Sequence, residues 1–217
     1  MFSPTTREGL IRWFETYGRA YPWRQESNPY YVLIAESLLR KTRARDVLGV
    51  YTTLISNYPT INDLARADVR ELELAIAPLG LPSRAQLLHE AARKIVDDFA
   101  GIVPNDYKTL IRLPGIGRYT ASAILCLGYG KHVAMVDEGV GRVLRRLNNI
   151  PKQHPAYEDR KLWAIAESLL PKEPDKVKKH NLALIDLAAL VCRPKAPKCY
   201  SCPLKEECRY EGTSHVD

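Results

Sequence analysis

The sequence predicts an all-α protein on the basis of three observations. Apolar residues recur at three- and four-residue spacing, no strand-like alternation is sustained, and N-capping residues stand before several of the periodic segments. An apolar stripe of this period is typical of a helix that packs one face on a core. The 217 residues suffice for one large domain or two small ones.

The predicted helices follow from their stripes and caps. Four stripes occur in chain order: Leu10, Trp13, Phe14 and Tyr17; Ala121, Ile124, Leu125 and Gly128; Val140, Val143, Leu144 and Leu147; and Leu162, Ile165, Ala166 and Leu169. Thr60 precedes a predicted helix over 61–67, Ser83 one over 84–99 and Asp137 one over 138–147. We interpret all four stripes as core packing.

Charge and apolar content limit the partners. The net charge of +7 and the pI of about 9.1 favour a polyanion, above all nucleic acid, although many basic proteins bind none. The longer apolar run 182–191 contains Asp186, which we expect to pair with a helix end, and no run suggests a membrane span. The first ten residues lack a secretory pattern. We expect a cytoplasmic monomer, nucleoid-associated in a prokaryote, with no membrane partner.

Four cysteines near the C-terminus predict a metal site. They form the pattern C-x6-C-x2-C-x5-C: Cys192, Cys199, Cys202 and Cys208. Four thiolates on one short loop can surround a 4Fe-4S cluster, and prolines and lysines between them suit a tight, basic wrap. A zinc site is the alternative, although zinc ribbons usually have two C-x2-C knuckles and this loop has one. The fifth cysteine, Cys126, fits a small buried apolar residue.

A glycine hairpin lies at Leu113–Gly117. Gly115 and Gly117 allow a sharp, partly left-handed turn, and the helix that follows begins with free amide groups. Such a helix start is a suitable seat for a phosphate, although most G-x-G turns only connect helices.

Two acidic residues stand in unusual places. Glu36 is the only charge in the apolar segment 31–39, where a carboxylate is costly unless it is paired, used, or set on a wet edge beside Arg40. Asp137 is either a simple N-cap or a rigidly held charge whose ionised form the helix dipole favours. Such a charge can stabilise a cationic transition state or orient water.

Three motifs resemble one family. The segment 113–121, followed by Met135-Val136-Asp137, resembles the signature of helix-hairpin-helix DNA glycosylases, L-P-G-I/V-G-x-x-T-A and then a catalytic aspartate. The cysteine loop resembles the iron–sulfur loop of the endonuclease III and MutY branches. The segment from Tyr21 to Thr42 resembles the MutY-type pattern P-W-x…P-Y…E-x-M/L-L-x-x-T.

The resemblance implies a fold of two helical domains with the active site in the cleft between them. A six-helix barrel with the hairpin would occupy 21–131, and an iron–sulfur cluster domain would combine 1–20 with 132–217. The partner would be double-stranded DNA with a mismatched or damaged base, whose target nucleotide is flipped out. Its expected contacts are phosphate at Gly115 and Gly117, the orphaned guanine at Arg40 and Lys41, and the vacated stack at Leu81, Pro82 and Ser83. For this last loop, a simple turn is the alternative.

Tyr119 indicates which glycosylase the chain resembles. Endonuclease III-like enzymes have a Schiff-base lysine at this position, and a phenol cannot form an imine. MutY usually has serine there, whereas archaeal-type glycosylases for thymine or uracil opposite guanine have tyrosine. The resemblance therefore implies hydrolysis without strong lyase activity. Glu36 would recognise or protonate the base, and Asp137 would assist cleavage of the bond between base and sugar.

Several alternatives stay open. A MutY-like adenine glycosylase would carry a further domain that reads oxidised guanine, and we expect that domain to be absent because the chain ends nine residues after Cys208. A non-catalytic DNA-binding iron–sulfur module would not need Glu36 and Asp137, and the long helical body argues against a small electron carrier. One departure from the family is Gly139, where related enzymes have Asn or His that would help to position Asp137 or its water.

Overall fold

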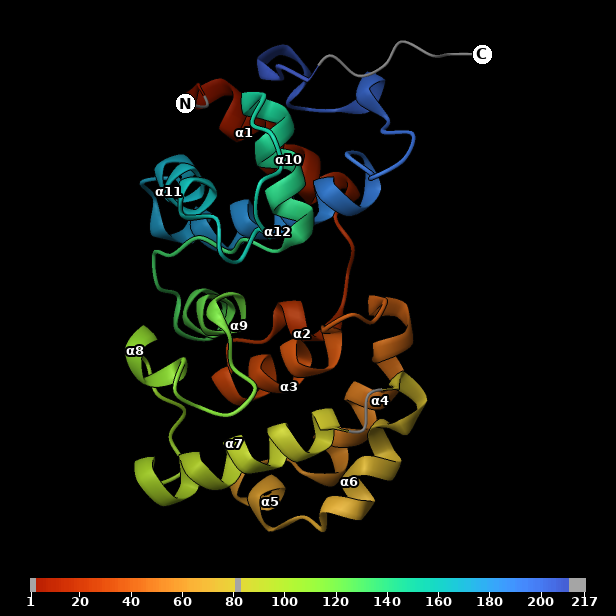
Figure 1. Cartoon of the computed structure of the whole chain (residues 1–217), viewed down its shortest axis with the longest axis vertical. Helices are drawn as coiled ribbons and strands as arrows, with labels where there is room; N and C mark the ends of the chain where they lie inside the picture. The colour runs from red at the N-terminus through yellow and green to blue at the C-terminus, as the bar shows by residue number, and fades with distance from the viewer. Residues whose placement is uncertain (1–2, 81–82, 211–217) are drawn as a thin grey trace. The chain divides into compact units, whose positions relative to one another are not determined.

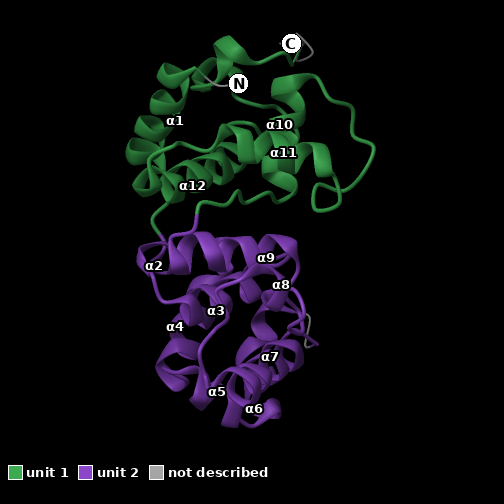
Figure 2. Cartoon of the chain, turned by 90° about the vertical axis from the view of Figure 1, so that its left-hand side faces the viewer, with its two compact units in different colours: residues 1–20, 132–217 green, residues 21–131 purple. Residues whose placement is uncertain are grey.

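The computed structural model describes residues 3–80 and 83–210. Within these ranges the chain forms twelve α-helices with short 3₁₀ and π turns, and it forms no strand there, so the predicted all-α class is confirmed. The chain divides into two compact units, residues 1–20 with 132–217 and residues 21–131 (Figure 2). No helix of the described residues is both long and apolar enough to cross a membrane.

Unit 2, residues 21–131, is built around one apolar helix. This helix, α3, contacts α2, α4, α7, α9 and a π turn at Ile124–Gly128, and seven of its eleven residues are buried. The helices of the unit in order are α2 (Pro22–Gln25), α3 (Pro29–Leu39), α4 (Ala44–Asn57), α5 (Ile61–Arg66), α6 (Val69–Ile76), α7 (Ser83–Phe99), α8 (Tyr107–Leu110) and α9 (Arg118–Ala123) (Figure 1). A helix that is apolar on nearly every side is stable only when it is enclosed by others.

The predicted caps in unit 2 fall at helix starts. Thr60 forms a capping box with Asp63, because its hydroxyl accepts the Asp63 N–H at 3.2 Å and the Asp63 carboxylate accepts the Thr60 N–H at 2.9 Å. Ser83, predicted to cap a helix over 84–99, is itself the first residue of α7. The helices α5 and α6 pack on α7, so the cap at Thr60 sets the first residue of one of the helices that cover α7.

Unit 1 joins the two ends of the chain. Its helices are α1 (Pro4–Tyr17), α10 (Glu138–Asn148), α11 (Arg160–Leu169) and α12 (Pro174–Leu190), followed by 3₁₀ turns at Cys199–Ser201 and Lys205–Glu207. The helix α12 contacts both α1 and α10, and α10 also contacts α11. The stripe from Val140 to Leu147 is buried as predicted.

The prediction for the first stripe is partly wrong. Leu10 is buried, but Tyr17 is 64% exposed and Ile11 is buried in its place. Tyr17 is the last residue of α1, and its ring rests on Trp13 with 6.2 Å between the ring centroids. The apolar pattern therefore extends one turn further than the core that it contacts.

Asp186 confirms its expected structural role. This fully buried carboxylate on α12 accepts the backbone N–H of Arg19 at 2.7 Å and the Arg19 Nε–H at 2.8 Å, and Arg19 Nη2 lies 2.6 Å away. Arg19 stands two residues beyond the last residue of α1. The pair therefore fastens the end of the first helix to α12.

Candidate active site

Glu36 lies in the middle of α3 and is 6% exposed. This burial excludes the alternative of a solvated edge. Its neighbour one turn on, Arg40, is exposed and donates from Nη1 to the carbonyl oxygen of Gly115 at 3.2 Å. The structure thus keeps one carboxylate inside an apolar helix bundle, a placement typical of acids with a chemical task.

Asp137 caps α10, as the sequence predicts. Its Oδ1 accepts the Val140 N–H at 2.6 Å, and its backbone is extended where the helix begins. The capping bonds and Arg142 lower the pKa of Asp137, but burial raises it more, so the pKa lies above its ordinary value. The helix start thus favours the ionised form, as expected, but removal of the carboxylate from water outweighs this stabilisation and the net pKa is raised.

Gly139 leaves little room beside Asp137. A Cβ at this position would lie 3.2 Å from Asp137 Oδ1 and 3.0 Å from the Ala188 methyl group of α12. The departure noted in the sequence thus has a structural consequence. A larger residue here would press on the carboxylate and on Ala188.

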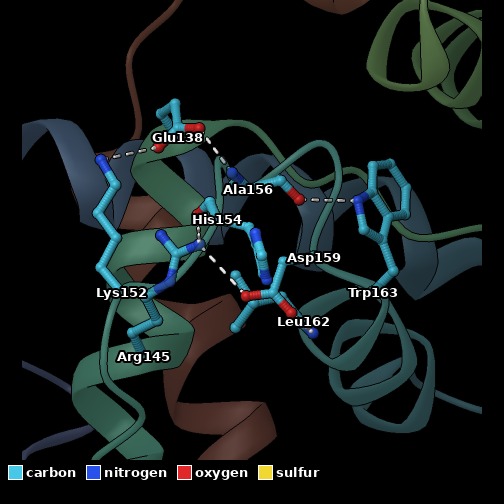
Figure 3. A network of polar contacts seen from close by, with 8 residues as sticks. All are labelled: Glu138, Arg145, Lys152, His154, Ala156, Asp159, Leu162 and Trp163. Atoms are coloured by element: carbon cyan, nitrogen blue, oxygen red, sulfur yellow. Dashed lines mark hydrogen bonds and ion pairs between the residues drawn. The ribbon is translucent and has the colours of Figure 1, made fainter.

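The residue after Asp137 fastens a loop onto α10 (Figure 3). The Glu138 carboxylate accepts the Ala156 N–H at 2.6 Å, and the Ala156 carbonyl accepts the Trp163 indole N–H at 3.1 Å. Further along α10, Arg145 donates to the His154 carbonyl at 2.7 Å. Several polar bonds therefore hold the loop between α10 and α11 against the helix that Asp137 begins.

The hairpin before α9 contains one left-handed residue. Gly115 has φ +72°, a conformation that strains other residues, and the turn closes with a bond from Ile116 N to Leu113 O at 3.2 Å. Gly117 is extended, and a Cβ there would meet nothing within 4 Å. The prediction that both glycines serve the turn holds for Gly115, whereas Gly117 leaves the start of α9 bare.

Tyr119 is the second residue of α9 and is half-buried. The helix α9 contacts α3, the helix that carries Glu36. Unit 2 therefore places these two predicted catalytic residues on neighbouring helices, while Asp137 belongs to unit 1.

The other predicted DNA contacts in unit 2 occupy two helix ends. Arg40 and Lys41 follow α3, both are exposed, and Lys41 has a left-handed φ of +56°. Ser83 is exposed at the start of α7. Leu81 and Pro82 lie outside the described residues.

Sequence reasoning missed the residue that joins these ends. Arg84 is 5% exposed, and its guanidinium group donates to the carbonyls of Leu38, in the last turn of α3, and of Arg40, directly after α3. The only signal in the sequence is a charge on the apolar side of α7, and it does not reveal the partner.

The four cysteines lie on one loop after α12. Burial and the charges of the other three thiols raise the pKa of Cys202 to about 11, so the four groups are close enough to interact. In the described part of the chain, no three His, Cys, Asp or Glu side chains are placed to hold a metal ion. Basic side chains of α10 support the loop, since Arg142 Nε donates to the Cys192 carbonyl at 2.9 Å and Arg146 Nη1 lies 3.4 Å from Cys192 Sγ. Cys126 is buried, as expected.

The helical fold, the glycine hairpin and the aspartate cap together define a helix-hairpin-helix protein. A family model described as "HhH-GPD superfamily base excision DNA repair protein" matches residues 34–168, more than half of the chain. The chain belongs to this superfamily, and the predicted membership is confirmed.

The similar proteins include archaeal, human and bacterial enzymes. The "Thymine/uracil-DNA glycosylase" of Methanothermobacter thermautotrophicus is 36% identical over 93% of this chain and 90% of that relative. The human "Adenine DNA glycosylase" is 35% identical over 94% of this chain but only 39% of its own length. These similarities agree with the resemblance inferred from the three motifs.

Solved structures also match. A thermostable thymine-DNA glycosylase has a TM-score of 0.87 and 36% identity, with 94% of each chain covered. An endonuclease III–DNA complex has a TM-score of 0.76 and 27% identity, with 96% of each chain covered.

Proposed function

We propose that the protein is a DNA glycosylase that hydrolyses the N-glycosidic bond of thymine or uracil mispaired with guanine. The observation that carries this proposal is Tyr119, two residues after the hairpin, in a chain that also has the buried Glu36 and the capping Asp137. The similarity to archaeal thymine/uracil glycosylases over nearly the whole chain supports it.

In this proposal Asp137 supplies negative charge to the sugar. Cleavage of the glycosidic bond leaves the sugar cationic, and a fixed carboxylate nearby lowers the energy of that state. Because burial raises the pKa of Asp137, its anion is poorly solvated and gains more from a neighbouring cation than an exposed anion does. The same carboxylate can orient the attacking water.

Glu36 acts on the base. A carboxylic acid held inside an apolar helix bundle can donate a hydrogen bond or a proton to the leaving pyrimidine. Protonation makes the base a better leaving group.

Tyr119 determines the fate of the abasic product. A phenol cannot form the imine through which a lysine nucleophile cuts the strand. We therefore infer that base release is not followed by strong AP lyase activity.

The hairpin and helix ends of unit 2 would hold the DNA. Gly117 leaves the first amides of α9 uncovered, and backbone amides at a helix start are suited to phosphate oxygens. Arg40, Lys41 and Ser83 are exposed at two further helix ends. Their cationic and hydroxyl groups suit the backbone and base edges of a duplex with a mismatched or damaged base.

The four thiols of the cysteine loop match a 4Fe-4S cluster in kind and number of donors, although among the described residues they are not gathered around one metal position. Cys192, Cys199, Cys202 and Cys208 would be the ligands, and Arg142 and Arg146 would offset their charge. When bound, such a cluster would brace the loop, and base release needs no electron transfer. Zinc is the competing metal, and the two differ in visible absorption and in iron and sulfide content.

An adenine glycosylase is the second candidate. Its support is the 35% identity to human adenine DNA glycosylase, and the tyrosine at position 119 argues against it by resemblance. The base that is released distinguishes the two candidates.

The test is base release from a panel of end-labelled duplexes that carry G·T, G·U, G·A and oxidised-guanine·A pairs. We expect release from G·T and G·U, with strand breaks that appear only after heating in alkali. Release of adenine alone would favour the second candidate, and breaks without alkali would contradict the role of Tyr119. A chain that binds these duplexes and releases nothing would be a non-catalytic module.

A further inference from the structure

Arg84 makes a dense set of bonds outside the residues assigned above. It is the second residue of α7, and its side chain is buried. One nitrogen, Nη1, donates to the Leu38 carbonyl at 2.7 Å, and the other, Nη2, donates to the Arg40 carbonyl at 2.6 Å. Both also lie 3.1 Å from the Thr42 hydroxyl.

These bonds satisfy backbone carbonyls at the end of α3. The last carbonyls of a helix have no partner within the helix, and the chain here turns through Lys41 in a left-handed conformation with φ +56°. That conformation is unfavourable for a residue with a side chain. Because the two nitrogens of a guanidinium group form a rigid planar fork, Arg84 fixes the carbonyls on both sides of Leu39 and holds the turn.

The same turn reaches the hairpin. Arg40, whose carbonyl Arg84 binds, donates from its own side chain to the Gly115 carbonyl at 3.2 Å. The helix α7 approaches the hairpin directly as well, since a Cβ on Gly115 would lie 3.1 Å from Leu87 Cβ. The hairpin thus rests on the turn after α3 and on the helix that Arg84 begins.

We propose that Arg84 is a positioning residue that couples the start of α7, the Arg40–Thr42 turn and the Gly115–Gly117 hairpin into one rigid face for recognising mismatched DNA. This inference rests on the proposed function for its DNA ligand, and on the bonds of Arg84 and Arg40 for the coupling. Three separate contacts with a duplex select a mismatch only if their spacing is fixed. A shift of about 1 Å in a positioning group can lower the rate of a reaction roughly 100-fold.

Lysine in place of Arg84 provides the sharpest variant. Arg84→Lys keeps the charge and most of the length of the side chain, but a single ammonium group cannot reproduce the fork across two carbonyls. Arg93→Lys, at an exposed position on the same helix, is the matched control.

The first measurement is amide hydrogen exchange of the full-length protein without DNA. We expect Arg84→Lys to speed exchange in peptides that cover 38–43 and also in those that cover 113–118, with the rest of α7 unchanged. Faster exchange confined to 38–43 would contradict the coupling, because the hairpin would then be independent of Arg84. This readout does not depend on enzyme activity.

The second measurement is the affinity for a G·U duplex with a non-cleavable sugar relative to a matched G·C duplex. We expect Arg84→Lys to reduce this ratio by roughly 10- to 100-fold, with matched-duplex affinity within about twofold, and Arg93→Lys to change neither. If Arg84→Lys lowers the melting temperature but leaves the ratio of G·U to G·C affinity unchanged, Arg84 serves stability alone and the proposal is overturned. Wild-type base release, measured in parallel, tests the proposed function separately.

Discussion

Asp137 combines a structural and a proposed chemical role in one carboxylate. As an N-cap it accepts the Val140 N–H, which an asparagine side chain also does well. As a buried acid its pKa is raised, so the ionised form that the proposed chemistry needs weakens the fold. The two roles can be separated, because only the second depends on charge.

Asp137→Asn is therefore expected to change how stability depends on pH. A carboxyl group whose pKa is raised on folding does not lower the free energy of unfolding below its pKa in the unfolded chain. It lowers that free energy as the pH rises through the raised pKa of the folded state. Melting temperatures from pH 4 to 8 should show the variant gaining on the wild type as the pH increases. A difference that is constant with pH would contradict the assigned burial.

His180 makes the opposite prediction. This fully buried residue of α12 has its pKa lowered from 6.5 to about 4 by burial and by Arg7. The contribution of neutral His180 to the free energy of unfolding is therefore complete above pH 6.5. It is lost as the pH falls towards 4, by up to about 3 kcal/mol.

The measurement for His180 is the free energy of unfolding in urea at pH 7, 5.5 and 4.5. In His180→Gln this part of the pH dependence should vanish, whereas His132→Gln, at an exposed histidine, should keep it. Equal slopes in the wild type and His180→Gln would refute the assignment.

At the scale of elements, the ion pairs of α12 with Glu15 of α1 and with Arg19, just beyond α1, differ strongly in burial. Arg19–Asp186 has a fully buried carboxylate, whereas the Glu15–Lys179 pair, 2.5 Å apart, is about half exposed on both sides. Buried pairs become costly when one partner is removed, and exposed pairs contribute little.

Asp186→Ala should accordingly destabilise the protein by roughly 3–5 kcal/mol, because Arg19 is left without its buried acceptor. Glu15→Ala, which breaks the exposed pair between α1 and α12, should cost less than about 1 kcal/mol. Chemical denaturation measures both values. Similar losses in the two variants would show that the burial of Asp186 does not matter.

The elements also show what the sequence can reveal. Thr60 and Asp137 were predicted as N-caps and cap their helices, because a cap is a local bond between residues three apart. Ser83, predicted to precede its helix, is instead the first residue of α7. The contact of Arg84 with the end of α3 joins positions more than forty residues apart, and no periodicity encodes it. The net rise in the pKa of Asp137 escapes the sequence for the same reason, since desolvation depends on residues distant in the chain.

At the scale of the whole molecule, the two units carry different parts of the proposed chemistry. Glu36 and Tyr119 belong to unit 2, and Asp137 and the cysteine loop belong to unit 1. The sequence predicts all of these residues by family motif, whereas their roles are a matter for kinetics.

The most direct test is single-turnover base release from a G·U duplex by the wild type, Glu36→Gln, Asp137→Asn and the double variant. We expect each single variant to fold and to lose roughly 100- to 1,000-fold in rate, and the double variant to be little slower than the worse single one, as for groups that act together. Near-normal release by Asp137→Asn would contradict the account.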